Sequence, residues 1–333
     1  MLDLFGGWRS PADLVRLLPN YSPASLAHGA AALVRHGLLE AQVGGQPNEP
    51  DDELWDSWDP AAGLLHFSTK DLRYVGADQA ADHLRARAAV TAMPSLTKRY
   101  RGARRVALPA PRLDGEFPRT LLERRTWRRF SSRPMSLDKL STLLGLSSAV
   151  EYWLPVKGIG RMPFTSYPSG GAQHPLEVYV LARRVAGLAP GLYHYAADAH
   201  RLELIRKGAS ARQIVRYLPT QRWYGSASAL FLITAVFSRT QWKYRFARGY
   251  RAVLAEAGHL CQNVCLTATW LGLAPFCTMA LADSAIERDL RVDGVTESVV
   301  YAAGVGTRPR GASWAPWPAP HRVRRIPGPL GRM

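Results

Sequence analysis

The stretch that decides the fold is residues 241–276, which read QWKYRFARGYRAVLAEAGHLCQNVCLTATWLGLAPF. From about residue 252 to residue 271 it is apolar nearly all the way round, which is typical of a helix buried on every side. The strongly polar positions inside this span are Glu256, His259, Gln262 and Asn263. We therefore expect a central helix that ends at Gly272, with Gln262 and Asn263 facing groups that can hydrogen-bond.

The dipeptide Lys243-Tyr244 leads into this helix and places a cation beside a phenol. Successive helical residues point about 100° apart, so both side chains can face one ligand only where the helix is irregular at its start. Without a family context, a surface lysine beside a packing tyrosine is the simpler interpretation of the pair.

The composition indicates a globular protein without a membrane span. The chain has 333 residues, 47% of them hydrophobic, which suits one large domain with an appendage or two domains. No apolar run reaches the roughly 20 residues that cross a bilayer, and the first 30 residues lack a signal-peptide pattern. We expect a cytoplasmic protein.

The three cysteines are Cys261, Cys265 and Cys277, which lie in one apolar region and argue against a disulfide framework. Cys261 and Cys265 share a helix face, but two thiols without further ligands are typical of core residues. No metal is therefore expected.

The net charge is +17, which raises the question of a nucleic-acid partner. Only six of the 43 basic residues are lysines, and the arginines are scattered along the chain. Scattered arginine reflects composition bias more often than a binding face, so nucleic acid is not the expected partner. An acidic small molecule or peptide fits the charge equally well.

Residues 1–45 read as a small helix, turn, helix, strand unit, the order of a winged helix. Ser10-Pro11 and Ser22-Pro23 each supply a helix start, and residues 38–41 read as a short strand. The unit has few basic side chains, so peptide docking or dimer packing fits it better than DNA binding.

Residues 46–118 read as a connector with a helix over 78–93 and a basic, proline-rich linker. Residues 311–333 form a Pro/Arg-rich tail.

The main domain, residues 119–310, is predicted to be α+β. A helix is expected over 136–146, and apolar or alternating runs predict strands over 176–182, 192–195, 201–205, 229–237 and 299–303.

Two further clusters of residues in this domain could bind a ligand. The run RRTWRRF at 124–130 offers guanidinium groups suited to phosphate, although a solvated basic run is the commoner case. The run YPSGGAQHP at 167–175 is either a ligand-binding turn or an ordinary one.

Other cofactor signatures are missing, since the sequence has no Walker A motif, no Rossmann glycine fingerprint and no HExxH. Glu256-x-x-His259 has the spacing of half a di-iron site, but a second copy is absent. NAD bound by a Rossmann domain is therefore not expected.

Five segments, taken together and in this order, resemble the nitroreductase-like flavoproteins, and among them the thiazole/oxazole-forming (azoline) dehydrogenases of the SagB/McbC type. The resemblance covers about residues 119–310, and Thr126 stands where serine is common, a change that keeps the hydroxyl. The segments that carry it are RRTWRRF, YPSGGAQHPLEVYV, GLYHYAADAHRLELI, KYRFARGYRAVLAEAGHLCQNVCLTATWLGL and AAGVG.

The resemblance implies a nitroreductase-like fold with FMN as cofactor, bound between the two subunits of a homodimer through the central helix. Gln262 would reach the ring edge with Asn263 beside it, and the glycine turn would line the isoalloxazine through Ser169, Gly170 and Gly171. The residues implied at the phosphate and ribityl chain are Arg124, Arg125, Thr126, Arg128, Gly304, Gly306 and Arg308.

Lys243-Tyr244 matches the adjacent Lys-Tyr pair of the azoline oxidases. Forming an azole from an azoline removes a hydride and a proton; a phenol of pKa about 10 is a poor base, but a neighbouring ammonium favours phenolate. Either residue of the pair can serve as the base. The expected activity is oxidation of peptide thiazolines or oxazolines in the maturation of a ribosomally made natural product, with a precursor peptide and a cyclodehydratase as partners.

Two alternatives remain open at this point. The first is an NAD(P)H-dependent nitro or quinone reductase of the same fold. The second is a winged-helix DNA- or peptide-binding protein with an inactive flavin domain. The sequence identifies neither the peptide, nor the choice between thiazoline and oxazoline, nor whether the substrate is a ribosomal peptide or a carrier-bound one.

Overall fold

The computed structural model describes residues 9–19, 22–35, 39, 41, 55, 57–98, 100, 102–104, 106–109 and 111–311. The helices are α1 (Pro11–Leu17), α2 (Pro23–Arg35), α4 (Asp59–Ser68), α5 (Ala77–Val90), α6 (Glu116–Glu123), α7 (Leu137–Ser148), α8 (Ala211–Tyr217), α9 (Phe237–Lys243), α10 (Arg248–Trp270) and α11 (Asp283–Leu290). The strands are β1 (Met135–Ser136), β2 (Val150–Val156), β3 (Gly160–Thr165), β4 (Leu176–Ala182), β5 (Val185–Ala186), β6 (Gly191–Ala196), β7 (Arg201–Lys207), β8 (Ala229–Val236), β9 (Leu273–Thr278) and β10 (Glu297–Thr307).

The main domain is built on a six-stranded antiparallel sheet with strand order β7-β6-β4-β8-β10-β9. Strand β8 reads ALFLITAV and is buried along nearly its whole length, because it lies inside the sheet with packed layers on both faces. The α+β class predicted from the sequence is confirmed.

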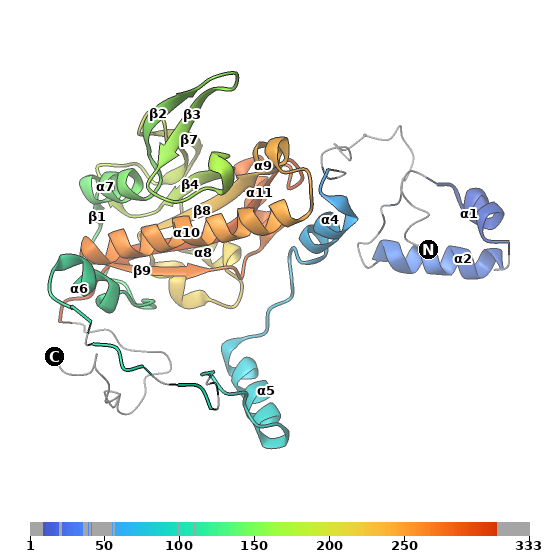
Figure 1. The fold of residues 1–333 in the computed structure, drawn as a ribbon, viewed down its shortest axis with the longest axis horizontal. Coiled ribbons are helices and arrows are strands. Elements are labelled where there is room, and N and C mark those ends of the chain that lie inside the picture. Colours follow the sequence, from blue (N-terminus) through green and yellow to red (C-terminus); the bar gives the residue numbers. More distant parts are fainter. Residues whose placement is uncertain are drawn as a thin grey trace.

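Helices cover both faces of the sheet, so that it forms the middle of three layers (Figure 1). Along β4, Val178 and Val180 join the core beneath α7 and α10, whereas Tyr179 and Leu181 join a second core beneath α8 and α11. Successive strand side chains point to opposite faces, which explains this alternation.

Helix α10 runs across one face of the sheet and is buried on one side only (Figure 1). Val253, Leu260 and Val264 lie on its inner, buried side. On its outer side Gln262 is exposed, and the side chain of Trp270 is 47% exposed. The prediction of all-round burial is therefore wrong for the single chain. The physical reason is that a small apolar side chain such as Ala255 suits a core position by its composition, whereas in this chain it lies exposed among the described residues.

The segment that the sequence suggests is a connector supplies part of the main core. Trp55 and Trp58 are buried in the cluster beneath α10, and α4 follows them along the chain. Lys70, just past α4, forms an ion pair of 2.7 Å with the buried Glu287. Helix α5 (Ala77–Val90) has no buried residue.

Helices α1 and α2 form at the two predicted starts, and α1 begins with a capping box between Ser10 and Asp13. They pack on each other (Figure 1). The strand predicted over 38–41 falls on residues of which only 39 and 41 are described. No helix in the described part of the chain is long and apolar enough to cross a membrane.

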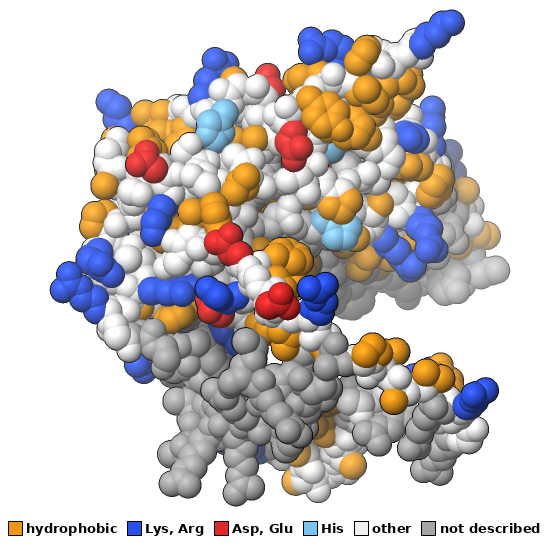
Figure 2. Space-filling model, turned by 60° about the vertical axis from the view of Figure 1, so that its left-hand side comes forward, with side chains coloured by type: hydrophobic (Ala, Val, Ile, Leu, Met, Phe, Trp, Pro, Cys, Tyr) orange, Lys and Arg blue, Asp and Glu red, His pale blue; other side chains and the backbone are white. Residues whose placement is uncertain are grey.

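The β2–β3 hairpin projects from the sheet and was not predicted from the sequence (Figure 1). Its side chains lack the alternation of a half-buried strand because β2 is exposed on both faces, with Tyr152 53% and the adjacent Trp153 39% exposed. Hydrophobic side chains gather at the top of the face shown in Figure 2, where this hairpin projects.

We expect acid to weaken the attachment of α4 through His66. Its ring nitrogens lie 3.1 Å from Tyr250 Oη and 3.3 Å from the Gly294 carbonyl oxygen. Burial, assisted by the charge of Lys70, lowers the pKa of His66 to about 4. The unfolded chain therefore binds this proton more tightly, and the free energy of unfolding should fall as pH drops from about 6.5 to about 4.

The measurement is urea unfolding of the wild type and of His66→Gln at pH 7.5 and pH 5.0. The contribution of His66 is about 1.4 kcal/mol for each pH unit within that interval. The variant should be less stable at pH 7.5 and should lose less stability on acidification. An identical loss in both proteins would contradict this role of His66.

Candidate functional site

The glycine turn predicted as a ligand site lies between β3 and β4 and includes Ser169, Gly170 and Gly171. Gly171 has φ of 64°, in the left-handed region that favours glycine. A Cβ at Gly171 would lie 2.4 Å from Tyr244 Oη and 2.8 Å from Lys243 Nζ. The turn and the Lys-Tyr pair, 72 residues apart, therefore form one site, and the missing side chain of Gly171 makes room for the pair.

Lys243 and Tyr244 lie at the break between α9 and α10, as their predicted joint role requires. Lys243 is the last residue of α9, and Tyr244 has the non-helical angles φ −114° and ψ 88°. Lys243 Nζ donates to the Gly171 carbonyl oxygen at 3.2 Å and lies 5.5 Å from the centre of the Tyr244 ring. Because the helix is interrupted here, both polar tips reach the same turn.

Glu256 is a site residue whose role sequence reasoning missed. Its Oε2 accepts hydrogen bonds from Ser169 Oγ at 2.9 Å and from the Gly170 backbone N–H at 3.2 Å. Burial raises the pKa of Glu256 to about 7, despite these hydrogen bonds. Its Oε1 is buried and has no hydrogen-bond partner within the described residues. The carboxyl group thus fixes the turn and changes its charge near neutral pH.

Trp58 is a second residue that the sequence did not indicate. Its Nε1 donates to the Tyr244 carbonyl oxygen at 2.8 Å, and its ring fills the space beside Gly249, where a Cβ would lie 2.8 Å from Nε1. The segment before α4 therefore positions the backbone of Tyr244. The only signal was a tryptophan in a polar, acidic stretch.

The arginine run lies at the other end of α10. The Trp127 backbone N–H donates to the Pro275 carbonyl oxygen of β9 at 2.8 Å, which anchors the run. Arg125 donates to the carbonyl oxygens of Leu122 and Arg124, and Arg308 donates to those of Leu273 and Thr269. Both arginines, which were predicted to bind the phosphate, therefore also satisfy carbonyl oxygens at the C-terminal ends of α6 and α10 and at the start of β9.

Arg124, Thr126 and Arg128 are half-buried beside this anchor. Among the described residues the Arg124 guanidinium and the Thr126 hydroxyl make no hydrogen bond, while Arg128 interacts with the Tyr224 hydroxyl. Two buried polar atoms, Trp127 Nε1 and Thr307 Oγ1, are also without partners in the described part of the chain. Unpaired polar atoms beside cationic groups suit a polar, anionic ligand.

Gly304 and Gly306 are buried in β10 and pack against aromatic rings. A Cβ at Gly304 would lie 2.2 Å from Phe276, and one at Gly306 would lie 2.5 Å from Phe130. This packing explains both glycines without a ligand. A phosphate contact for either residue stays a prediction.

The two polar residues of α10 diverge. Asn263 Nδ2 donates to Ser166 Oγ at 3.3 Å, close to the glycine turn in sequence. Gln262 is exposed on the outer side of the helix. Within the single chain, Gln262 therefore lies apart from the buried core.

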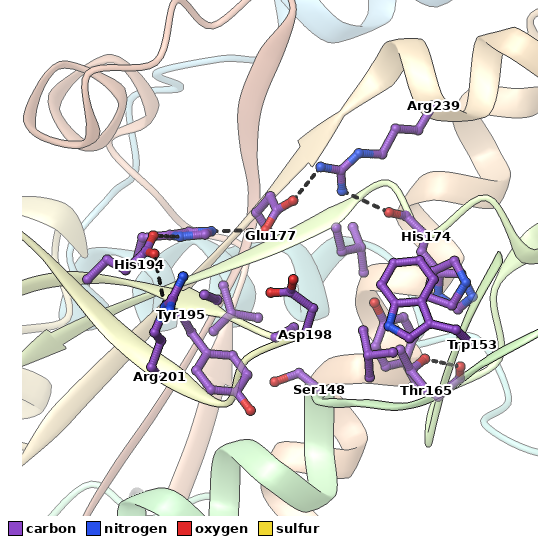
Figure 3. A pocket seen from close by; sticks show the side chains of 18 of the residues that line it. Ser148, Trp153, Thr165, His174, Glu177, His194, Tyr195, Asp198, Arg201 and Arg239 are labelled. Atoms are coloured by element: carbon purple, nitrogen blue, oxygen red, sulfur yellow. Dashed lines mark hydrogen bonds and ion pairs between the residues drawn. The ribbon is translucent and has the colours of Figure 1, made fainter. Parts of the chain in front are cut away.

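A cavity of about 540 Å³ shares Gln173 and His174 with the end of the glycine turn (Figure 3). His194 bridges Glu177 at 3.0 Å and Glu203 at 3.1 Å, and Arg239 pairs with Glu177. The hydrogen bond to Glu177 raises the pKa of His194 against the opposing effect of burial. Trp153 of the projecting hairpin lines the cavity too, so that it combines charged and aromatic side chains.

The two ends of the candidate site are well separated within one chain. Glu256 contacts the glycine turn, whereas Thr269 accepts from Arg308. Thirteen residues of helix correspond to about 20 Å. The outer side of α10, which carries Gln262, runs between the two ends.

Comparison with known proteins identifies the domain. A model of the nitroreductase family matches residues 121–307. The chain is 33% identical over 172 residues, covering 52% of its length and 82% of the relative, to a Methanocaldococcus jannaschii protein that bears the name nitroreductase.

Two other relatives bear names that describe the processing of trifolitoxin and of microcin B17. The trifolitoxin-processing protein TfxB of Rhizobium leguminosarum bv. trifolii is 32% identical over 173 residues, covering 50% of the chain and 46% of the relative. The microcin B17-processing protein McbC of Escherichia coli is 30% identical over 145 residues, covering 42% and 52%. The chain thus spans about half the length of these two proteins.

Proposed function

The chain belongs to the nitroreductase family, and from that premise we propose that it oxidises thiazolines or oxazolines of a peptide to the aromatic azoles, with FMN as cofactor. The observation that carries the proposal is the convergence of Lys243 and Tyr244 on Gly171. Similarity to two peptide-processing proteins supports the substrate class. The experiment is to mix the FMN-containing protein with an azoline-containing peptide without oxygen and to record the flavin absorbance. The absorbance should fall as the peptide is oxidised.

The residues present fit FMN at both ends of the candidate site. Arg124, Thr126 and Arg128 would hold the phosphate, where buried polar atoms lack partners among the described residues. The Ser169–Gly171 turn would meet the ring system, and Glu256 keeps that turn in place. Bound FMN would supply a hydride acceptor.

The residues of this chain would handle the proton. Aromatisation breaks two C–H bonds of the azoline ring, one as a hydride and one as a proton. Tyr244 or Lys243 would accept the proton, because the polar tips of both side chains meet at the same glycine turn. Trp58 and Gly171 hold the pair by a hydrogen bond and by the space that the glycine leaves.

The chemistry of the substrate defines the partners. An azoline in a peptide arises by cyclisation and dehydration of a Cys, Ser or Thr residue, so a cyclodehydratase must act first. The cavity between Trp153 and His194 would receive peptide residues next to the azoline, because it is continuous with the glycine turn through Gln173 and His174.

We expect a homodimer that pairs through the outer side of α10. Within one chain the arginine run at 124–130 and the glycine turn lie about 20 Å apart along α10. A two-fold arrangement would bring the arginine run of one subunit to the glycine turn of the other, so that one FMN could contact both. Light scattering of the FMN-containing protein should give twice the chain mass, and Gln262→Arg should shift it toward the monomer with loss of flavin. A monomer that retains FMN would contradict this arrangement.

We expect Arg124→Ala combined with Arg128→Ala to weaken FMN binding. Each charged hydrogen bond contributes about 1.5–3 kcal/mol, so the dissociation constant should rise by more than about a hundredfold. The measurement is flavin fluorescence on titration of the apoprotein. Arg129→Ala, at an exposed position of the same run, is the matched control and should bind normally. Unchanged affinity of the double variant would place the phosphate elsewhere.

An NAD(P)H-dependent nitro or quinone reductase is the second candidate. The name of the Methanocaldococcus jannaschii relative, of which the chain covers 82%, favours it. A reductase passes a hydride to its substrate, and water can supply the proton, so a positioned base is unnecessary. Lys243 and Tyr244 therefore separate the two candidates.

A further inference from the structure

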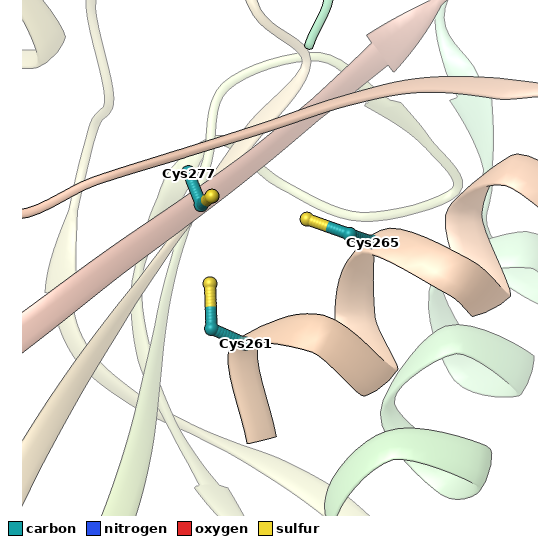
Figure 4. Close-up of side chains that lie close together, drawn as sticks. All are labelled: Cys261, Cys265 and Cys277. Carbon is teal, nitrogen blue, oxygen red and sulfur yellow. The ribbon is translucent and has the colours of Figure 1, made fainter. Parts of the chain in front are cut away.

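The three cysteines converge although they come from two elements. Cys261 and Cys265 lie on the inner side of α10, and Cys277 lies on the neighbouring strand β9. Their sulfur atoms all lie within 4.8 Å of one another. Figure 4 shows the three thiols turned toward a common point. The sequence had indicated only the helical pair, because the position of Cys277 depends on the packing of β9 against α10.

The surroundings of this cysteine cluster suit a cation with thiolate ligands. Cys261 and Cys265 are almost fully buried, and Cys277 is partly buried. The Arg124 guanidinium acts electrostatically on Cys265 and Cys277, and the Tyr301 hydroxyl interacts with Cys277. Three thiolates carry a charge of −3, so a bound cation leaves a negative complex, and a buried charge needs a partner such as Arg124.

We propose that Cys261, Cys265 and Cys277 form a binding site for one thiophilic metal ion, Zn²⁺ or Cu⁺. Sulfur lies about 2.3 Å from Zn²⁺, so small side-chain rotations would bring the three sulfurs into coordination. Soft thiolate ligands select these two ions. No fourth Cys, His, Asp or Glu joins the cluster among the described residues, so Cu⁺ would be bound by the three sulfurs and Zn²⁺ would take an exogenous fourth ligand.

The test uses the reduced, flavin-containing protein under anaerobic conditions. After dialysis against Zn²⁺, and separately against Cu⁺, elemental analysis should give one ion per chain. X-ray absorption at the metal edge should show three sulfur atoms, at about 2.3 Å for zinc. A metal content far below one per chain with both ions, or ligation by nitrogen and oxygen alone, would overturn the proposal.

Cys277→Ala removes one of the three proposed ligands and should weaken metal binding by more than about a hundredfold. Mutating a residue that only hydrogen-bonds to a metal ligand already costs about 10–100-fold in affinity. His259→Ala is the control on the exposed side of α10 and should bind as the wild type does. Equal affinity of Cys277→Ala and wild type would exclude this site.

A second measurement applies even where a cysteine variant folds poorly. In the wild type, bound metal should protect the partly buried Cys277 thiol from alkylation, and a chelator should restore its reaction. A Cys277 thiol that reacts equally with and without metal would overturn the proposal. Protection that a reductant reverses and a chelator does not would indicate a disulfide, and it would overturn the proposal too.

Discussion

Tyr244→Phe is expected to lower azole formation at least about a hundredfold while FMN stays bound. The substitution removes the phenolic proton chemistry and nearly preserves the ring, and a positioned base contributes about 10²–10⁴ in rate. Lys243→Ala should have an effect of the same order, because it removes the ammonium that lies 5.5 Å from the Tyr244 ring centre. The measurement is the single-turnover rate with an azoline-containing peptide.

Neighbouring residues supply the controls. Trp242→Phe changes an exposed aromatic residue, and Arg245→Ala removes an exposed cation; both flank the pair in sequence. These variants should keep most of the rate. Wild-type rates in both Tyr244→Phe and Lys243→Ala would exclude a proton-transfer role for the pair.

Gly171→Ala is expected to reduce turnover by about a hundredfold or more. The added Cβ would lie 2.4 Å from Tyr244 Oη and 2.8 Å from Lys243 Nζ, so the pair must move. A displacement of about 1 Å from the reacting geometry can cost about 10²-fold in rate. The measurement compares kcat with FMN content, and FMN content should fall much less than kcat.

Gly208→Ala is the matched control for backbone strain. Gly208 has φ of 85°, and a Cβ there would meet nothing within 4 Å. Both substitutions place a side chain in the left-handed region, at a stability cost of about 1–2 kcal/mol. The control should therefore share the loss of stability and keep the activity. Similar activity losses in both variants would mean that strain alone accounts for the effect.

The sequence predicted the central part of the fold because its strands carry a clear pattern. Strand β4 (Leu176–Ala182) was predicted with the observed bounds, and β8 differs from its prediction only at its last residue. The β2–β3 hairpin was missed since its exposed strands show no alternation. The outer side of α10 was misjudged because Ala255 is compatible with a core or with an interface.

The candidate site was predicted in part. Lys243, Tyr244 and Gly171 were recognised as separate motifs, and the fold brings them together. Glu256 and Trp58 were not assigned to the site, because their roles depend on contacts across 87 and 186 residues of sequence. Such contacts follow from the packing of whole elements and leave no local pattern.

The most direct test of the proposed function is anaerobic single turnover of the FMN-containing protein with an azoline-containing peptide. We predict that the peptide bleaches the flavin absorbance and becomes 2 Da lighter for each azole formed. Tyr244→Phe should slow both changes at least about a hundredfold. Nitroarene reduction with NAD(P)H is measured beside it. Brisk nitroarene reduction, no reaction with the azoline peptide and indifference to Tyr244→Phe would contradict the account and identify a reductase.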